Sequence, residues 1–264
     1  RLMLTDQRWQ KLLQVMKSTG RIYNKPEHRM TFEGILYRLR TGIPWRDLPT
    51  EFGGWSTIYR RFNLWSKKGL LNNLFNELAK LADYDWVFAD GSIVKAHQHS
   101  TGAATSDNEC IGKSRGGNST KIHLAVDSGG LPIYFELSEG QRNDIARAQS
   151  LVDHLQEVNI FVGDKGYDSD ALREYIEARG GISVIPKRNY GQDIDKESVD
   201  WCLYKYRHLV ENAFARIKNY RSISTRYKKL ARNYASMVSL AFSMMAADVL
   251  LSAICTAKVN RPYK

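Results

Sequence analysis

Four polar side chains with the spacing Tyr204-x2-Arg207-x3-Glu211-x6-Lys218 can share one face of a helix. At about 100° per residue they fall within roughly 60° of one another, beside an apolar stripe. That stripe contains Leu203, Val210, Phe214 and Ile217. A helix with this pattern places the Glu211 carboxylate at the edge of its buried face, with basic and phenolic groups next to it. Such a set suits a site that binds a metal ion and a phosphate together.

Two further acidic residues follow apolar runs that are typical of β-strands. Asp90 closes the run Trp86-Val-Phe-Ala, and Asp164 closes the run Asn159-Ile-Phe-Val-Gly. Carboxylates at the ends of adjacent strands can converge across a sheet, and a third from a facing helix would complete an oxygen cage suited to Mg²⁺. Taken singly, each aspartate is also explained as the cap of a turn or helix. Asp168 is the better candidate for a helix cap, because a helical pattern starts directly after it.

The charge balance favours a polyanionic partner. The 264 residues include 39 Lys and Arg against 28 Asp and Glu, which gives a net charge of +11. Nucleic acid is the usual partner of so basic a chain, and a basic protein without such a partner is the alternative. The hydrophobic content of 43% allows a sizeable core. Three widely separated cysteines lack metal-binding spacing and indicate a reducing compartment.

Helical periodicity dominates residues 1–82. Apolar positions recur at helical spacing in Trp9–Met16 and in Phe32–Leu39, and Gly42 is placed to end the second helix. We expect a third helix capped by Ser56 and a fourth after Gly69, which together suit a helix-turn-helix. The third helix carries candidate contacts to bases in the DNA major groove off its apolar face: Thr57, Arg60, Arg61 and Asn63.

From Tyr84 onward the pattern predicts a mixed α/β sheet with helices on its faces. Strands are expected at 86–90, 120–126, 131–137, 159–163 and 182–185, and helices at 145–155 and 169–179, before the Glu211 helix. The stretches 101–119 and 192–200 are expected to be loops. The apolar segment Ala235–Cys255 is interpreted as a buried core or dimer helix. A membrane span is not expected there, because the segment carries Asp248 and several serines.

Together these residues resemble the DDE transposases of bacterial insertion sequences, in particular the insertion-sequence-five group, over nearly the whole chain. Tyr204, Arg207, Glu211 and Lys218 match the family signature Y-x2-R-x3-E-x6-K. Asp90-Gly-Ser and Gly-Asp164-Lys-Gly-Tyr-Asp match its two aspartate motifs. Lys113-Ser-Arg-Gly-Gly117 with Thr120-Lys-Ile-His123 resembles the segment between those motifs, and Phe32–Pro49 resembles the N-terminal helical domain.

The resemblance implies an RNase H-like mixed-sheet catalytic domain preceded by an all-α, helix-turn-helix-like domain. We expect the DNA-binding domain at 1–82, the catalytic domain at 83–234 and, at 235–264, a helix that packs on the core or on a dimer partner. Asp90, Asp164 and Glu211 are expected to hold two Mg²⁺ ions, for which Mn²⁺ can substitute. The expected partners are double-stranded DNA, at element ends and target, and at least one further copy of the chain on DNA. The bacterial cytoplasm is the expected location, with no membrane contact.

Further DNA contacts are expected beside the carboxylates and in the basic stretch after the Glu211 helix. The candidates are Arg115, Lys121, Tyr204, Arg207, Lys218, Arg226, Lys228 and Lys229. Each of them is otherwise an ordinary surface charge or ion-paired side chain.

The predicted function is that of a transposase that binds the terminal inverted repeats of its element, cleaves there and joins the freed 3′-OH to target DNA. Two alternatives remain. One is an RNase H-like nuclease that cleaves without joining, and the other is a non-catalytic, element-derived DNA-binding repressor. The intact acidic trio disfavours the repressor, since a protein without catalysis has no physical reason to keep all three carboxylates.

Overall fold

The computed structural model describes residues 3–18, 25–103, 108–155, 158–188 and 199–259, with the side chains of the last helix described as far as Ala247. It forms two compact units, each discontinuous along the chain. The helical unit comprises Arg1–Lys80, Asn219–Ser224 and Arg232–Lys264, and the sheet unit comprises Leu81–Lys218 and Thr225–Ala231. These units differ from the predicted division at 1–82, 83–234 and 235–264, because residues from 219 onward alternate between them.

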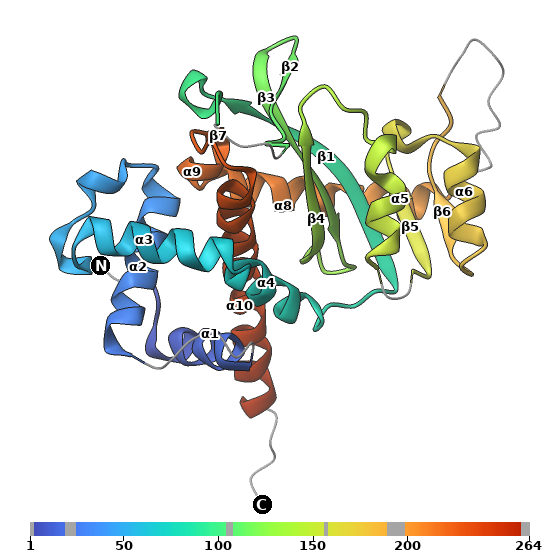
Figure 1. Cartoon of the computed structure of the whole chain (residues 1–264). Coiled ribbons are helices and arrows are strands. Elements are labelled where there is room, and N and C mark those ends of the chain that lie inside the picture. Colours follow the sequence, from blue (N-terminus) through green and yellow to red (C-terminus); the bar gives the residue numbers. More distant parts are fainter. Residues whose placement is uncertain (1–2, 19–24, 104–107, 156–157, 189–198, 260–264) are drawn as a thin grey trace, which may run out of the picture. The chain divides into compact units, whose positions relative to one another are not determined.

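The helical unit begins with α1 (Asp6–Ser18), α2 (Pro26–Thr41), α3 (Trp55–Lys67) and α4 (Leu70–Ala79), drawn in blue to teal in Figure 1. Pro26 suits the start of α2, because its fixed φ is already helical. Gly42 ends that helix at φ 74°, and its N–H donates to the Arg38 carbonyl. The predicted apolar faces of α1 and α2 are buried. Gly54, rather than the predicted Ser56, stands at the N-terminal cap of α3.

The last helix, α10 (Ala231–Val259), completes the helical unit. Phe242 packs on Phe75 of α4 with ring centroids 5.6 Å apart, and the Ser236 hydroxyl donates to Ser66 of α3. Most of its described side chains are buried, as one of the two predicted roles requires, whereas a role between protomers remains a prediction. The short helix α9 (Arg221–Ser224) packs on α2. Within the described part of the chain, no helix has the length and apolar character needed to cross a bilayer.

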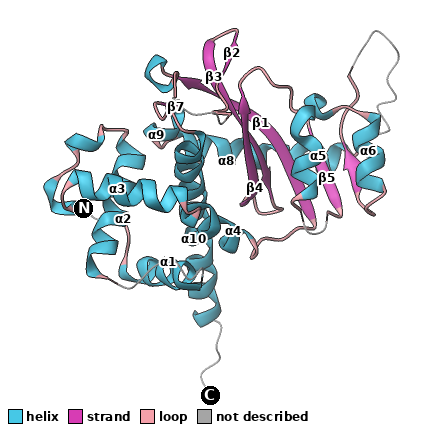
Figure 2. Ribbon diagram, viewed as in Figure 1, coloured by secondary structure: helices cyan, strands magenta, loops and turns pink. Residues whose placement is uncertain are grey.

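The sheet unit is built on a mixed sheet, magenta in Figure 2, with β4 beside β3 and the order β3-β1-β5-β6. Its strands are β1 (Trp86–Ala96), β2 (Gly112–Ser114), β3 (Gly117–Val126), β4 (Pro132–Glu139), β5 (Ile160–Gly163), β6 (Ile182–Val184) and β7 (Thr225–Arg226). The pairs β1–β3 and β3–β4 are antiparallel, and the pairs β1–β5 and β5–β6 are parallel. The predicted mixed sheet after an all-α region is confirmed.

Helices cover both faces of this sheet (Figure 1). On one face, α5 (Ile145–Asp153) and α6 (Asp170–Glu177) share a buried cluster with Val87 and Ala89 of β1. On the other lies α8 (His208–Lys218), whose predicted apolar seam is buried at Val210, Phe214 and Ile217. Because side chains alternate along a strand, Asp90 and Ser92 of β1 turn toward the α8 face.

Three predicted strand, loop and helix ranges in the sheet unit differ from the structure. β1 continues to Ala96 instead of ending at Asp90, because the residues after Asp90 keep their pairing with β3. The described part of 101–119 includes β2 and the start of β3, a hairpin that turns at Arg115-Gly116. The helix expected through Tyr204 is divided into α7 (Trp201–Tyr204), a 3-10 turn (Lys205–Arg207) and α8. Most of the predicted loop 192–200 lies outside the described residues.

Candidate active site

Asp90 of β1 and Asp164, which directly follows the parallel strand β5, occupy neighbouring positions. Ala89 of β1 is paired with Gly163, the last residue of β5, so the next residue along each segment is one of the two aspartates. The Asp90 carboxylate accepts a hydrogen bond from the Gly91 N–H at 2.7 Å. Sheet register therefore brings together two carboxylates that stand 74 positions apart in the sequence (164 minus 90).

The capping roles near Asp164 differ from the prediction. Asp164 precedes a 3-10 turn (Lys165–Tyr167), and its Oδ1 accepts from the Gly166 N–H at 2.7 Å. Ser169, rather than Asp168, caps α6, with its hydroxyl accepting from the Leu172 N–H. Asp168 instead pairs with Arg173 at 2.6 Å, so the predicted helix-cap role of Asp168 is wrong.

Arg207 links acidic groups from the strand and the helix. Its Nη1 donates to Asp90 Oδ2 at 3.1 Å, and its Nη2 donates to Glu211 Oε1. Burial lowers the pKa of the Arg207 guanidinium, but Asp90 and Glu211 outweigh burial and raise that pKa above its ordinary value. A permanently charged guanidinium therefore lies between two of the three predicted catalytic carboxylates.

The surroundings of Asp90 disfavour its negative charge. Burial raises the pKa of the Asp90 carboxyl above its usual range. The Gly91 N–H and Arg207 oppose this rise, whereas the nearby carboxylates Asp164 and Asp144 add to it, because like charges disfavour ionisation. Several carboxylates facing a single arginine make a site that would gain from a further cation.

Of the remaining signature residues, Lys218 contacts the same face of β1 as Arg207, and Tyr204 lies near Arg207. Lys218 Nζ donates to the Ser92 hydroxyl at 2.7 Å, two residues beyond Asp90 in the sequence. Tyr204 is half-buried and close enough to Arg207 to interact with its charge. The structure thus brings the four signature positions toward one site, even though the helix that carries them is interrupted.

Arg226 is a predicted DNA contact that the structure contradicts. The side chain has no exposed surface. Its guanidinium donates to the carbonyls of Cys110, Lys228 and Lys229 and to the Thr120 hydroxyl. A guanidinium with several donors in a fixed plane can join such scattered acceptors, so Arg226 holds the chain around β7 in place and does not face DNA.

Lys121 is a second predicted DNA contact that the structure contradicts. Its side chain is 10% exposed and forms an ion pair with Asp144, with Nζ and Oδ2 2.7 Å apart. The same ammonium donates to the Arg142 carbonyl at 3.1 Å. Sequence reasoning places basic side chains at the surface, whereas Lys121 neutralises a buried carboxylate.

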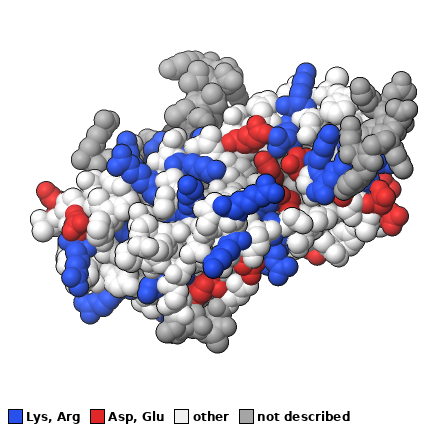
Figure 3. Space-filling view, turned by 90° about the horizontal axis from the view of Figure 1, so that it is seen from above, with Lys and Arg blue, Asp and Glu red and all other residues white. Residues whose placement is uncertain are grey.

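The other predicted DNA contacts remain predictions. Thr57 and Arg60 are exposed on α3, while Arg61 and Asn63 are half-buried there. Arg115 is exposed at the tip of the β2–β3 hairpin, and the exposed Lys229 follows the half-buried Lys228. On the face shown in Figure 3, Lys and Arg side chains are widely spread, with Asp and Glu in smaller groups between them.

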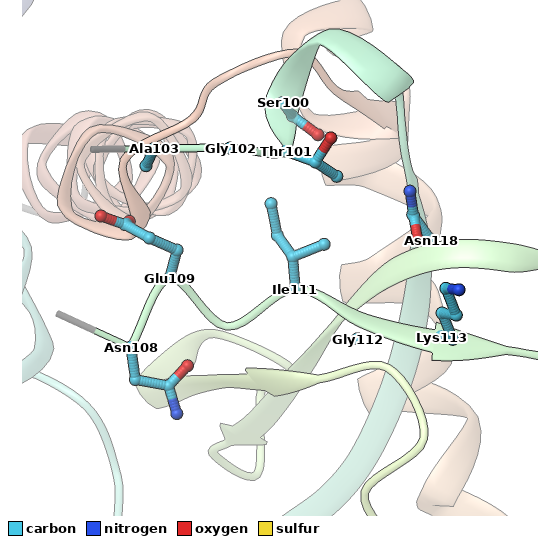
Figure 4. Close-up of a pocket in the computed structure, with 10 residues that line it drawn as sticks. All are labelled: Ser100, Thr101, Gly102, Ala103, Asn108, Glu109, Ile111, Gly112, Lys113 and Asn118. Carbon is cyan, nitrogen blue, oxygen red and sulfur yellow. The ribbon is translucent and has the colours of Figure 1, made fainter. Parts of the chain in front are cut away.

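A pocket of about 460 Å³ lies between the turn after β1 and the chain that leads into β2. Figure 4 shows Ile111 projecting into it, with Ser100 and Thr101 opposite. Glu109 and Lys113 are the ionisable side chains in its lining, and none of the clustered carboxylates belongs to it. Its lining therefore offers no set of groups for phosphoryl transfer.

The carboxylates fit a divalent metal in donor type. Asp90 and Asp164 offer oxygen ligands from adjacent strands, which is the donor that Mg²⁺ prefers. Glu211 is held by Arg207, and among the described residues no three His, Cys, Asp or Glu side chains lie close enough to share an ion. Arg207 would have to release Glu211 before all three carboxylates could bind one ion.

Sequence reasoning missed a fourth carboxylate at this site. Asp144 stands immediately before α5, where an aspartate is normally interpreted as a helix cap. Its side chain makes no cap hydrogen bond and turns toward β3. Gly91 and Gly166 leave the space that it occupies, but the sequence alone does not show which side chain fills that space.

Family comparisons agree with this geometry. The family described as "Transposase DDE domain" matches residues 82–246, more than half of the chain. The chain belongs to the DDE transposases. The family described as "Putative transposase of IS4/5 family" matches residues 4–75, which places this transposase in the IS4/IS5 group. DDE transposase domains generally use divalent metal ions.

Individual relatives support the same assignment. A Brucella ovis protein named "Putative transposase for insertion sequence element IS6501" is 35% identical over 130 residues, 48% of this transposase and 96% of the relative. A Burkholderia cepacia protein named for the element IS402 is 25% identical over 144 residues, 50% of this chain and 64% of its own. The piggyBac transposase in a synaptic complex with hairpin DNA superposes with a TM-score of 0.59 over 98% of this chain and 75% of its own. At 9% identity that likeness shows the fold alone, and the predicted RNase H-like fold is confirmed.

Proposed function

We propose that this transposase binds the terminal inverted repeats of its own element and moves that element by cut and paste. The observation that carries the proposal is the β1–β5 register, which sets Asp90 beside Asp164. Glu211 belongs to the same site through Arg207, which binds both Asp90 and Glu211. A net charge of +11 suits DNA as the substrate.

The three carboxylates would hold two Mg²⁺ ions, with Mn²⁺ as a substitute. Bound ions supply Lewis acidity that activates an attacking oxygen and stabilises a leaving one. Arg207 and Lys218 bind the phosphate through charge-assisted hydrogen bonds, and Tyr204 contacts the DNA beside them. In this reading Arg207 exchanges its carboxylate partners for phosphate oxygens when DNA enters.

The chemistry has two steps that each exchange one phosphorus–oxygen bond for another. A water oxygen first attacks the phosphorus at the element end, and the bond from phosphorus to the 3′-oxygen breaks, which leaves a free 3′-OH. That 3′-oxygen then attacks a phosphorus in target DNA and displaces the 3′-oxygen of the target strand. Neither step needs a covalent bond between protein and DNA, so no Ser or Tyr serves as a nucleophile.

DNA recognition is assigned to both units. In the helical unit, α3 presents Thr57 and Arg60 for contact with the element end, and Arg61 and Asn63 lie beside them. In the sheet unit, the accessible basic groups among the predicted contacts include Arg115 and Lys229. At least two copies act together, because two element ends must meet one target. Light scattering of the complex with end DNA tests this, and one protein copy per paired-end complex would contradict it.

Cleavage and joining of labelled end DNA test the catalytic assignment. Asp90→Asn, Asp164→Asn and Glu211→Gln should each abolish both steps, because the same groups serve both, while end binding persists. Asp168→Asn is the matched control and should retain both steps, since Asp168 pairs with Arg173 outside the trio. Near-normal rates in any trio variant, or full activity in excess chelator, would show that the assignment is wrong.

Product analysis separates the proposal from its two alternatives. A transposase gives end DNA joined to a supplied target duplex. A nuclease gives hydrolysed ends without joined product, and a repressor gives binding without either reaction. The flanking DNA of the gene offers an independent check, because matching inverted repeats there would identify the substrate.

A further inference from the structure

Asp144 is tied to β3 although it belongs to the start of α5. Its Oδ2 lies 2.7 Å from Lys121 Nζ, and its Oδ1 lies 3.2 Å from His123 Nδ1. The other ring nitrogen of His123 is 2.8 Å from the Ser138 hydroxyl of β4. The carboxylate thus connects a helix start to the strand that pairs directly with β1.

Two glycines leave the space that Asp144 occupies. Gly91 is paired with His123 across β1 and β3, and a Cβ at Gly91 would lie 1.8 Å from Asp144 Oδ1. A Cβ at Gly166 would lie 3.3 Å from Asp144 Oδ2 and 2.7 Å from Asp164 Oδ1. Any side chain at Gly91 would therefore displace the Asp144 carboxylate.

Asp144 lies close to both proposed metal ligands, because each of the two glycines beside it is a near neighbour of one ligand in the sequence. Gly91 directly follows Asp90, and Gly166 is two residues beyond Asp164 and donates its N–H to the Asp164 carboxylate. Because Asp90 and Gly91 face opposite sides of the strand, Asp144 approaches from the face opposite Arg207. The Asp144 carboxylate therefore packs beside the backbone of both segments, the one that carries Asp90 and the one that carries Asp164.

The cluster around Asp144 is buried and charged. The side chains of Asp144, Lys121 and His123 are 16%, 10% and 0% exposed. Burial acts to raise the pKa of the Asp144 carboxyl, but His123 and Lys121 outweigh burial and hold that pKa below its usual range. Asp144 is therefore ionised near neutral pH, and its charge reaches Asp90.

We propose that Asp144 is a positioning residue of the active site. By filling the space beside Gly91 and Gly166, it sets the spacing between Asp90 and Asp164. Lys121 keeps this buried carboxylate in place and balances its charge. The inference rests on the proposed function, because it takes Asp90 and Asp164 to be metal ligands. Loss of such a supporting residue typically weakens metal binding about 10- to 100-fold.

Mn²⁺ binding to the DNA-free protein, followed by the electron paramagnetic resonance signal of free Mn²⁺, tests this role without relying on activity. Asp144→Asn should raise the apparent Kd about 10-fold or more. Asp168→Asn is the matched control, because Asp168 is 15% exposed and paired with Arg173 at 2.6 Å, yet it is not among the groups nearest to a Cβ at Gly91 or Gly166. An unchanged Kd in Asp144→Asn, with a fall in melting temperature like that of the control, would overturn the proposal.

The double variant Lys121→Met/Asp144→Asn separates positioning from net charge. It loses one positive and one negative charge, so a purely electrostatic role predicts Mn²⁺ binding like that of the wild type. Positioning predicts that binding stays weak, and full restoration would overturn it. Replacing a whole buried ion pair is often tolerated, so this variant also serves if the single one fails to fold.

Asp90→Asn is the reference variant, because its Mn²⁺ binding tests the metal-ligand assignment separately from the positioning role of Asp144. If it weakens Mn²⁺ binding while Asp144→Asn does not, the positioning role of Asp144 is rejected and the proposed function stands. If Asp90→Asn leaves Mn²⁺ binding unchanged, the metal assignment fails and the role of Asp144 fails with it. Weakened binding in both variants, with the Asp168→Asn control unaffected, supports both.

Discussion

Arg207 Nη1 lies 3.1 Å from Asp90 Oδ2, and this contact joins the 3-10 turn before α8 to the central strand β1. The same guanidinium also donates to Glu211. A single protein cation thus pairs with two carboxylates that a divalent ion would need. Metal binding and this contact should compete, because both depend on the same oxygens.

Competition predicts an unusual result for Arg207→Met. The DNA-free variant should bind Mn²⁺ about 10-fold more tightly, equivalent to about 1.4 kcal/mol, because the competing cation is gone. Cleavage of end DNA should nevertheless be lost together with the phosphate contact. Paramagnetic resonance of Mn²⁺ and a cleavage assay measure the two effects.

Lys218→Met is the matched control for this prediction. Lys218 binds the Ser92 hydroxyl and no carboxylate of the trio, so its loss should slow cleavage without tightening Mn²⁺ binding. Weaker Mn²⁺ binding in Arg207→Met would mean that Arg207 orients the carboxylates instead of competing for them.

Arg60 tests end recognition by α3. In an Asp90→Asn background, which prevents cleavage, Arg60→Ala should weaken binding to end DNA. A base contact would cost about 1–3 kcal/mol and relax specificity at one position, whereas a phosphate contact would weaken all sequences and flatten the salt dependence. The full chain is needed, because α10 completes the helical unit.

Titrations with end and scrambled duplexes across a salt series distinguish these outcomes. Lys17→Ala, an exposed basic residue in the last turn of α1, is the control and should bind like the parent. Unchanged binding by Arg60→Ala at every salt concentration would place recognition elsewhere.

Arg226 should matter for stability. Replacement by Lys keeps the charge but cannot join three carbonyls and a hydroxyl in different directions. Arg226→Lys should therefore lower the free energy of unfolding by roughly 3 kcal/mol, through unsatisfied buried acceptors. Urea denaturation measures this loss, with the exposed neighbour Lys229→Met as the control. A loss no larger than that of the control would contradict the buried role.

Acid stability should depend on Asp168. Burial acts to raise the pKa of the Asp168 carboxyl, but the Arg188 N–H and Arg173 outweigh it and hold that pKa below its ordinary value. The ionised carboxylate therefore stabilises the fold above the unfolded pKa of about 3.9, and this contribution is lost as pH falls through the lower folded value. The difference in melting temperature between wild type and Asp168→Asn should be steady near neutral pH and shrink below about pH 4. A difference that grows in acid would contradict this assignment.

The periodicity of apolar residues correctly predicted which face of a helix is buried. Phe32, Ile35, Leu36 and Leu39 repeat at helical spacing, and all four are fully buried in the structure. The end of β1 could not be predicted in the same way. Gly91-Ser92 has the composition of a strand end, yet pairing with distant β3 residues keeps the strand going.

The burial of Arg226 and Asp144 could not be predicted from neighbouring residues either, because their partners are distant in the sequence. The partners of Arg226 include Thr120, which lies 106 residues away, and Asp144 is 23 residues from Lys121. An aspartate before a helix is normally a cap, so no local signal distinguishes Asp144. Gly91 is visible in the motif, but only the sheet register shows which side chain needs its space.

The helical unit is discontinuous along the chain, so its N-terminal helices are synthesised long before α10, which completes it. Phe75 and Ser66 have their partners in α10. Because α10 begins at Ala231, where the sheet unit ends, it leaves the ribosome after the rest of the sheet unit. Most of the sheet unit can fold while α3 and α4 still lack those partners, since domains generally fold during synthesis. A chain cut short before α10 would then carry a nearly complete catalytic half and a helical half with uncovered apolar faces, which favours its aggregation or proteolysis.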